Sequence, residues 1–246
     1  MSSPPADLGA AKPALFLDVD GTLVGIEDHP GDVRADAELI ALLVDLAGRL
    51  DGALSLISGR SIAEIDRIFA PARFPSAGSH GAELRFDGDA ANPAPAEFPE
   101  AILQRARQFA EEHDGLLVEK KRAGLALHYR RAPQLETDCR DFAAGLMREL
   151  GPDFRLIDGK MVLEIAPRSH HKGEAIRELL QHRPFHGRRP VFVGDDVTDE
   201  DGFRVVNDLG GLSIRVGHGD TTAARYALDD VASVRNWLQS VAGGME

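Results

Sequence analysis

The fold is decided by the stretch Ala14-Leu15-Phe16-Leu17-Asp18-Val19-Asp20-Gly21-Thr22. Four apolar residues stop abruptly at a polar turn that carries two carboxylates. This is the pattern of a strand that is buried on both faces and ends at a polar rim. Strands of that kind occur in parallel sheets with helices on both sides, so the stretch predicts an α/β protein.

The segments that follow alternate between helix and strand. Leucines from Leu39 to Leu50 recur at helical spacing, and a second buried run, 53–57, ends at Ser58-Gly59-Arg60 before a helical stretch, 61–69. The same alternation returns late in the chain, with predicted helices and strands at 172–181, 190–193, 199–208, 212–216 and 231–241. We therefore expect a Rossmann-like core with a parallel sheet, formed by residues 14–84 and 167–246.

The stretch between the two core segments has a different pattern. Strands are predicted at 116–121, 125–129, 154–156 and 161–165, and helices at 99–113 and 135–150. Paired strands with short turns favour an antiparallel sheet covered by helices. We expect residues 85–166 to form an inserted α+β cap domain, 87–99 to be a connecting segment, and 1–13 to be a flexible N-terminal tail.

The composition excludes several classes of protein. The 246 residues carry 28 Lys and Arg against 40 Asp and Glu, a formal charge of −12 that opposes binding to nucleic acid. The single cysteine, Cys139, excludes a disulfide scaffold. No apolar run approaches the roughly 18 residues that span a bilayer. We expect the N-terminal residues to be a loose tail rather than an export signal. We expect a cytoplasmic protein without a membrane partner, a monomer by default, with an oligomer left open.

Acidic residues cluster at the ends of two buried strands. Asp18 and Asp20 follow the first strand, and Asp195, Asp196 and Asp199 follow the strand at 191–193. Ligands of open parallel sheets bind at the carboxyl ends of the strands, where these acids would converge and repel one another unless a cation compensates. Oxygen ligands without Cys or His at ligand spacing predict Mg²⁺, which is usually bound together with a substrate phosphate.

A phosphate on this metal gives roles to the remaining polar groups. Ser58 and Thr22 can donate hydroxyl hydrogen bonds to phosphoryl oxygens, and Lys172 adds a positive charge. Asp18 is the candidate nucleophile, because attack by a carboxylate divides one difficult displacement into two easier ones. Asp20 is the candidate acid/base that protonates the leaving alcohol and later deprotonates water.

These residues resemble, in order and spacing, the haloacid dehalogenase superfamily of phosphohydrolases. Further blocks resemble the trehalose-6-phosphate phosphatase family: 56–60, 78–83, 119–121, 128–130, 163–167, 172–173 and 194–203. The last block, Gly194-Asp195-Asp196 onward, is specific, since sister sugar phosphatases carry a different pattern there. One departure is His171, where the family often has Asn before the motif lysine.

The resemblance implies Mg²⁺-dependent hydrolysis of trehalose 6-phosphate through an aspartyl-phosphate. Mg²⁺ would be held by Asp18, by the backbone carbonyl of Asp20 and by Asp195, with Asp196 and Asp199 orienting its waters. The residues implied to bind the substrate are Arg60, His80, Glu83, Glu119, Lys121, His128 and Glu164.

Three alternatives stay open at this point. The chain could act on another sugar phosphate, of the sucrose-phosphate or mannosylglycerate-phosphate kind, or be a phosphoryl-transferring mutase. It could also be a catalytically silent sugar-phosphate sensor, although every motif acid is present. A calcium loop after Gly194 is disfavoured because its first ligand position is Val197, and no nucleotide-binding Gly-rich loop or serine-hydrolase elbow is found.

Overall fold

The computed structural model describes residues 1–8, 12–26, 30–86, 98–121, 123–217 and 221–245. The chain forms two compact units, which are described separately: unit 1 comprises Met1–Asn92 and His171–Glu246, and unit 2 comprises Pro93–His170. The predicted connecting segment 87–99 lies mostly outside the described residues, as does Arg122 in a predicted turn. Within the described parts, no helix is both long and apolar enough to cross a membrane.

Unit 1 is built on a seven-stranded sheet in the order β11-β10-β9-β1-β2-β3-β4. Its strands are parallel except for β4, which pairs antiparallel with β3. The strands are β1 (Pro13–Leu17), β2 (Leu54–Ile57), β3 (Ser76–Gly78), β4 (Glu83–Arg85), β9 (Arg189–Gly194), β10 (Leu212–Val216) and β11 (Tyr226–Leu228). The predicted α/β fold with a mainly parallel sheet is confirmed.

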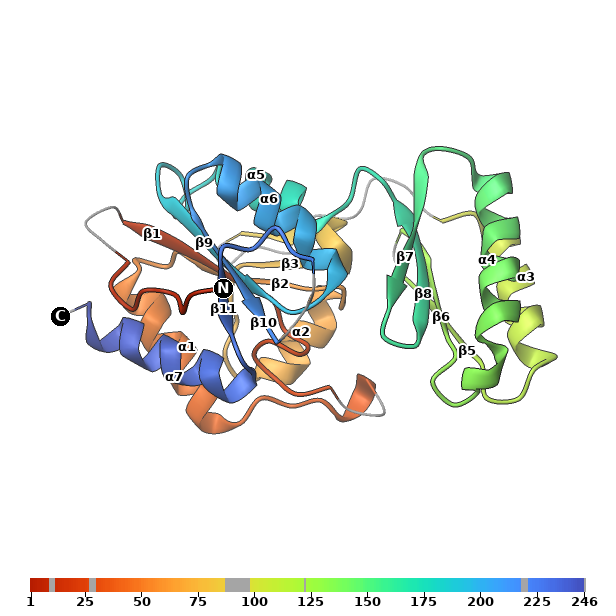
Figure 1. The fold of residues 1–246 in the computed structure, drawn as a ribbon, viewed down its shortest axis with the longest axis horizontal. Coiled ribbons are helices and arrows are strands. Elements are labelled where there is room, and N and C mark those ends of the chain that lie inside the picture. Colours follow the sequence, from red (N-terminus) through yellow and green to blue (C-terminus); the bar gives the residue numbers. More distant parts are fainter. Residues whose placement is uncertain (9–11, 27–29, 87–97, 122, 218–220, 246) are drawn as a thin grey trace. The chain divides into compact units, whose positions relative to one another are not determined.

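Helices cover both faces of this sheet, as the crossover connections of parallel strands require. Figure 1 shows α1 and α7 together on one face and α5 and α6 on the other. The helices of unit 1 are α1 (Ala37–Arg49), α2 (Ile62–Phe69), α5 (Lys172–Leu179), α6 (Glu200–Asp208) and α7 (Val231–Gly243).

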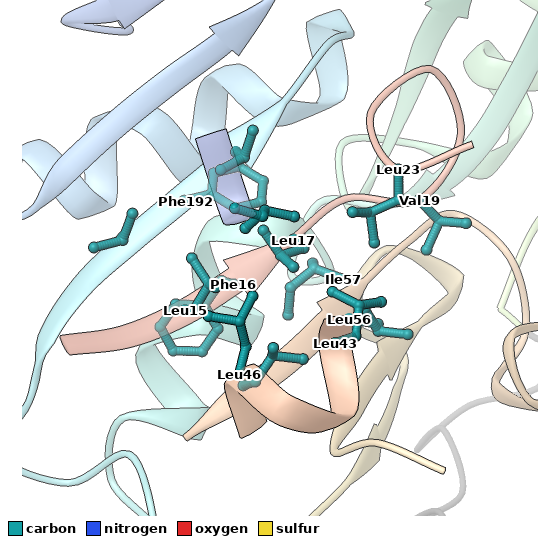
Figure 2. Close-up of a cluster of buried hydrophobic side chains, with 14 of the residues drawn as sticks. Leu15, Phe16, Leu17, Val19, Leu23, Leu43, Leu46, Leu56, Ile57 and Phe192 are labelled. Carbon is teal, nitrogen blue, oxygen red and sulfur yellow. The ribbon is translucent and has the colours of Figure 1, made fainter. Parts of the chain in front are cut away.

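The central strand β1 is buried along nearly its whole length. Residues 14–17 are fully inaccessible to solvent, and Leu43 and Leu46 of α1 pack against the same core (Figure 2). Burial of each such large apolar side chain contributes about 1.5–3 kcal/mol. The turn that follows β1 therefore starts from a rigid support.

The N-terminal residues contact the core of unit 1. The sequence predicts a flexible tail over 1–13, whereas the structure gives residues 2–8 contacts with β11, with the core and with α7. Ser2 forms a parallel bridge with Tyr226 of β11, Leu8 is buried in the core, and the Trp237 indole donates to the Pro5 carbonyl at 3.0 Å. One apolar side chain and main-chain pairing at a sheet edge are enough to order this segment, which its Ser, Pro and Ala content does not reveal.

Unit 2 is an antiparallel sheet of four strands in the order β5-β6-β8-β7. Its strands are β5 (Leu117–Lys120), β6 (Leu125–His128), β7 (Phe154–Gly159) and β8 (Val162–Pro167), and its helices are α3 (Glu100–Glu111) and α4 (Glu136–Leu150). The two helices lie side by side along one face of the sheet (Figure 1).

The strand register sorts the side chains of unit 2 between two faces. Leu125, Leu127 and Leu163 are buried in the cores that include α3 and α4. Their neighbours in sequence point to the opposite face, because side chains alternate along a strand. Glu119 lies opposite Ala126, which lies opposite Glu164 on its other side, so both acids share the face that these helices do not cover.

Candidate active site

Three adjacent parallel strands place the candidate catalytic groups at one edge of the sheet. Asp18 follows β1, Ser58 follows β2 and Asp195 follows β9, and β1 lies between the other two. The Asp18 amide donates to Val193 of β9 at 3.0 Å, which ties the two strand ends together. The chain leaves β1 toward β2 on one side, while β9 adds to the other side, so this edge is a topological switch point.

Lys172 links two buried carboxylates at this edge. Its Nζ donates to Asp18 Oδ1 and to Asp199 Oδ1, both at 2.7 Å. The three side chains are at most 5% exposed. The Thr22 hydroxyl donates to the other oxygen of Asp18 at 3.0 Å. Asp18 is thus held at both oxygens, and each oxygen keeps a further lone pair for another partner.

The buried position and the acidic neighbours of Asp18 disfavour its charged form. Burial raises the pKa of Asp18 well above its usual range, and the charges of Asp199 and Asp195 raise it further, while Lys172 opposes the rise. The pKa of Lys172 is itself raised, because its attraction to Asp18 and Asp199 outweighs the cost of burial. The ammonium therefore stays charged but does not by itself balance the acids around it.

The same acids form a group that suits a metal ion. Asp18, Asp195 and Asp199, all buried, each offer a carboxylate oxygen, and these oxygens lie within 4.8 Å of one another. Three carboxylates against the single ammonium of Lys172 leave an excess of negative charge in this group, which a divalent cation would neutralise. An all-oxygen donor set is what hard cations such as Mg²⁺ prefer. The residues present therefore fit a metal of this class.

Gly21 leaves the room that Asp195 occupies. Its φ is +78°, and a Cβ on its backbone would lie 2.2 Å from Asp195 Oδ2. Any other residue would displace that carboxylate and strain the turn. The Gly in the motif after Asp20 is therefore a condition for the acid cluster.

Asp199 is already engaged by the protein. Besides Lys172, it accepts from the backbone amides of Asp195 and Asp196 at 3.0 and 2.9 Å. These contacts make Asp199 the anchor of both the lysine and the loop that carries Asp195. Asp196 is half-buried and accepts from the amide of Val197 at 2.6 Å, so it caps the short 3₁₀ turn 197–199.

Ser58, Arg60 and Asp20 form a second group beside the first. Ser58 is buried, and its Oγ accepts from the Arg60 amide at 3.1 Å. The Arg60 guanidinium donates to both carboxylate oxygens of Asp20 at 2.7 Å. The Asp20 side chain thus turns to Arg60, and the carboxylate cluster is made by the other acids.

His80 lies in the turn between β3 and β4, and Glu83 is the first residue of β4; both belong to unit 1. His80 has a left-handed backbone, with φ +56°, and is 5% exposed. A Cβ on Gly59 would lie 2.6 Å from its Nε2, so the imidazole approaches the residue that follows Ser58. Glu83 accepts from the Ser79 hydroxyl at 2.8 Å and from the Ile62 amide at 3.3 Å. Its visible role is to hold this turn against the start of α2.

Two helix caps near the site were missed by the sequence reasoning. Ser61 and Glu64 form a reciprocal capping box at the start of α2, directly after Arg60; the spacing Ser-x-x-Glu is a signal that could have revealed it. His171 Nδ1 accepts from the Glu174 amide at 3.1 Å and so caps α5 immediately before Lys172. A side chain other than Asn can therefore cap this helix.

Unit 2 brings its predicted residues together as well. Glu119 lies 2.6 Å from Lys121 Nζ and 3.0 Å from His128 Nε2. Burial would raise the pKa of Glu119, but the hydrogen bond to His128 and the charge and hydrogen bond of Lys121 outweigh it, and the pKa falls to about 2. Glu164 is half-buried on the same face. This face offers both hydrogen-bond donors and acceptors, as binding of sugar hydroxyls requires.

Comparison with solved structures identifies the fold of this chain. A solved structure of a phosphatase of the haloalkanoate (HAD) superfamily, from Bacteroides thetaiotaomicron, aligns with a TM-score of 0.60 over 91% of each chain. At 14% identity this likeness concerns the fold alone. The fold is that of the HAD phosphatases, with a Rossmann-like core.

Sequence comparison identifies the family within the class of HAD-fold phosphatases. The chain belongs to the trehalose-phosphatase family, whose model matches residues 16–232. It is 42% identical over 241 residues to the trehalose-6-phosphate phosphatase of Escherichia coli, covering 96% of this chain and 89% of that protein. A solved structure described as a trehalose-6-phosphate phosphatase related protein aligns with a TM-score of 0.77 at 29% identity, over 93% of this chain and 96% of the other. The predicted family is confirmed.

Proposed function

We propose that the protein hydrolyses trehalose 6-phosphate to trehalose and inorganic phosphate. The observation that carries the proposal is Asp18, a buried carboxylate at the end of the central strand that Lys172 and Thr22 hold at its two oxygens. Membership of the trehalose-phosphatase family supports the substrate. The reaction is the transfer of a phosphoryl group, first to the protein and then to water.

In the first step an oxygen of Asp18 attacks phosphorus and the bond between phosphorus and the sugar oxygen breaks. Asp20 gives its proton to that oxygen, so the leaving group departs as an alcohol. In the second step water attacks the aspartyl-phosphate and passes a proton to Asp20. The bond to Asp18 breaks, and both carboxylates return to their first state.

Other residues act on charge and orientation. Lys172 and the Ser58 hydroxyl would neutralise and orient the phosphoryl oxygens, since a loose transition state gains most from positioning and positive charge. Asp18, Asp195 and the backbone carbonyl of Asp20 would hold Mg²⁺, which supplies charge neutralisation for the phosphate. Asp199 keeps Lys172 in place.

Unit 2 supplies, in this proposal, the groups that distinguish the sugar. Glu119, Lys121, His128 and Glu164 lie on the sheet face that α3 and α4 leave uncovered. Lys121 and Lys120 give a matched pair of variants, because Lys120 pairs with Glu100 and is 53% exposed, whereas Lys121 is 15% exposed beside Glu119. Lys121→Met should raise KM for trehalose 6-phosphate by about tenfold or more, the value of one lost charged hydrogen bond, and Lys120→Met should leave it unchanged.

The proposal is tested by phosphate release from trehalose 6-phosphate, sucrose 6-phosphate and glucose 6-phosphate, with and without Mg²⁺. We expect a preference for trehalose 6-phosphate of at least tenfold in kcat/KM, dependence on the metal, and loss of turnover in Asp18→Asn. A preference for another sugar phosphate would contradict trehalose 6-phosphate as the substrate. More than a few per cent of activity in Asp18→Asn would contradict nucleophilic catalysis by this residue.

The cellular setting is also proposed from the sequence. The charge of −12 and the single cysteine favour a cytoplasmic enzyme that binds a small molecule and no nucleic acid. We take the monomer as the working form. Light scattering of the purified protein checks the last point, since a dimer would double the mass of 26.6 kDa.

A further inference from the structure

The sequence resemblance assigns Arg60 to the substrate, but in the structure its guanidinium holds Asp20. Nε donates to Oδ2 and Nη2 to Oδ1, both at 2.7 Å. Two parallel hydrogen bonds from one planar group fix the orientation of a carboxylate as well as its position. A single contact from a lysine would fix the position alone.

The arginine is the more buried member of this pair. The Arg60 amide donates to Ser58 Oγ at 3.1 Å, and its carbonyl accepts from the Ser79 amide at 2.7 Å. Its side chain is 10% exposed and also lies 3.8 Å from Glu64. The Asp20 side chain is 32% exposed. The backbone of Arg60 is therefore held at its amide and carbonyl, and its guanidinium is buried between Asp20 and Glu64.

The backbone of Asp20 is held separately from its side chain. Asp20 forms an isolated bridge with Val24, and the Gly21 amide donates to the Val24 carbonyl at 2.8 Å. These contacts place the Asp20 Cα but leave the rotation about its side-chain bonds open. Among the described residues, the two hydrogen bonds from the Arg60 guanidinium restrict that rotation.

We propose that Arg60 is the positioning residue for Asp20, the acid/base of the reaction proposed above, and acts through this carboxylate rather than as a ligand of the sugar. The two parallel hydrogen bonds hold both oxygens of the carboxylate and so fix the orientation from which it exchanges a proton with the sugar oxygen and with water. The inference rests on the proposed function for the identity of the acid/base.

A double-mutant cycle in kcat separates the two roles. Arg60→Met should lower kcat by about 10–100-fold, part of the 10²–10⁴ that an acid/base contributes, and change KM less than about threefold. Asp20→Asn should lower kcat by a larger factor than Arg60→Met. The kcat of the double variant should equal that of Asp20→Asn within about threefold, because a group that acts through Asp20 has nothing left to position. Arg60→Lys, which keeps the charge but loses the bidentate geometry, should fall between wild type and Arg60→Met.

The control is Arg73→Met, which removes an exposed partner of Asp66 and should leave kcat and KM unchanged. The fluorescence of Trp237 during thermal unfolding shows whether each variant is folded. If Arg60→Met slows the Asp20→Asn enzyme by the same factor as wild type, or raises KM tenfold at constant kcat, Arg60 binds the substrate and the inference is wrong.

The cycle is run with trehalose 6-phosphate and with p-nitrophenyl phosphate, so that the two proposals fail separately. Wild-type activity on the aryl phosphate alone overturns the proposed substrate and leaves the cycle intact to test Arg60. An additive cycle on either substrate overturns the role of Arg60 alone, and a wild type that hydrolyses neither overturns both.

Discussion

Asp199→Asn should destabilise unit 1 by about 2–4 kcal/mol, because no orientation of the amide satisfies its neighbours. Asp199 Oδ1 accepts from Lys172, and Oδ2 accepts from two backbone amides. The NH₂ group of an Asn must face a donor on one side or the other. Breaking a buried ion pair costs about 3–5 kcal/mol of unfolding free energy. Loss of the negative charge at 199 also removes its repulsion of Asp18, which offsets about 1 kcal/mol of this cost.

The reciprocal change is Lys172→Met, which removes the ammonium between Asp18 and Asp199 and should cost about 4–5 kcal/mol. The double variant should lose less unfolding free energy than the sum of the two single losses, by about 2 kcal/mol or more, since each substitution removes a partner that the other residue needs. Asp208→Asn, at the exposed end of α6, is the control for the same substitution and should cost less than about 0.5 kcal/mol.

Urea unfolding in EDTA at pH 7.5 measures these values on the metal-free chain. The only tryptophan, Trp237, is buried in the core of unit 1 and reports its unfolding selectively. The slope m should be unchanged across the variants. A cost below about 1 kcal/mol for Asp199→Asn, or an additive double variant, would refute the view that Asp199 anchors Lys172.

Three further changes test other parts of the structure. Gly21→Ala should weaken activation by Mg²⁺ at least tenfold, measured by phosphate release against metal concentration, because its Cβ would meet Asp195. Leu8→Ala should cost about 2–4 kcal/mol in urea unfolding if the N-terminal segment packs as described, and a cost near zero would restore the flexible tail. Glu119 has a lowered pKa of about 2 against 4.5, so it contributes stability above pH 4.5 that is lost as the pH falls toward 2. Between pH 5 and 3, wild type should lose about 1 kcal/mol more than Glu119→Gln after allowance for solvent screening, by far-UV circular dichroism in urea; equal losses would contradict the shift.

The elements that the sequence predicts well are those with a strong local pattern. The apolar runs that end in charged or glycine residues gave β1 and β10 almost to the residue, because a strand buried on both faces leaves little else to specify. The short strands β3, β4 and β11 were missed. Each has three residues, and β3 is Ser-Ala-Gly, so its conformation comes from pairing with distant strands and not from its own propensity.

The site divides in the same way. Topology alone predicts that Asp18 and Asp195 approach each other, since each residue follows the carboxyl end of a strand in the same parallel sheet. The partner of each charge could not be predicted. Arg60 and Asp20 are 40 positions apart, and with 28 cations and 40 acids in the chain the choice of pair depends on side-chain orientation that only the folded structure supplies.

Asp18, Asp20 and Asp199 differ in how many of their carboxylate lone pairs already accept hydrogen bonds from the protein. One oxygen of Asp199 accepts from two backbone amides and the other accepts from Lys172. Both oxygens of Asp20 accept from Arg60. Asp18 accepts one hydrogen bond at each oxygen and so keeps the lone pairs that the proposed reaction needs for phosphorus and a cation. Since these carboxylates have similar intrinsic chemistry, their different proposed roles follow from their neighbours. An arginine moved from position 60 to a position beside Asp18 should therefore occupy the oxygens of the proposed nucleophile and lower kcat more than it lowers the stability of unit 1.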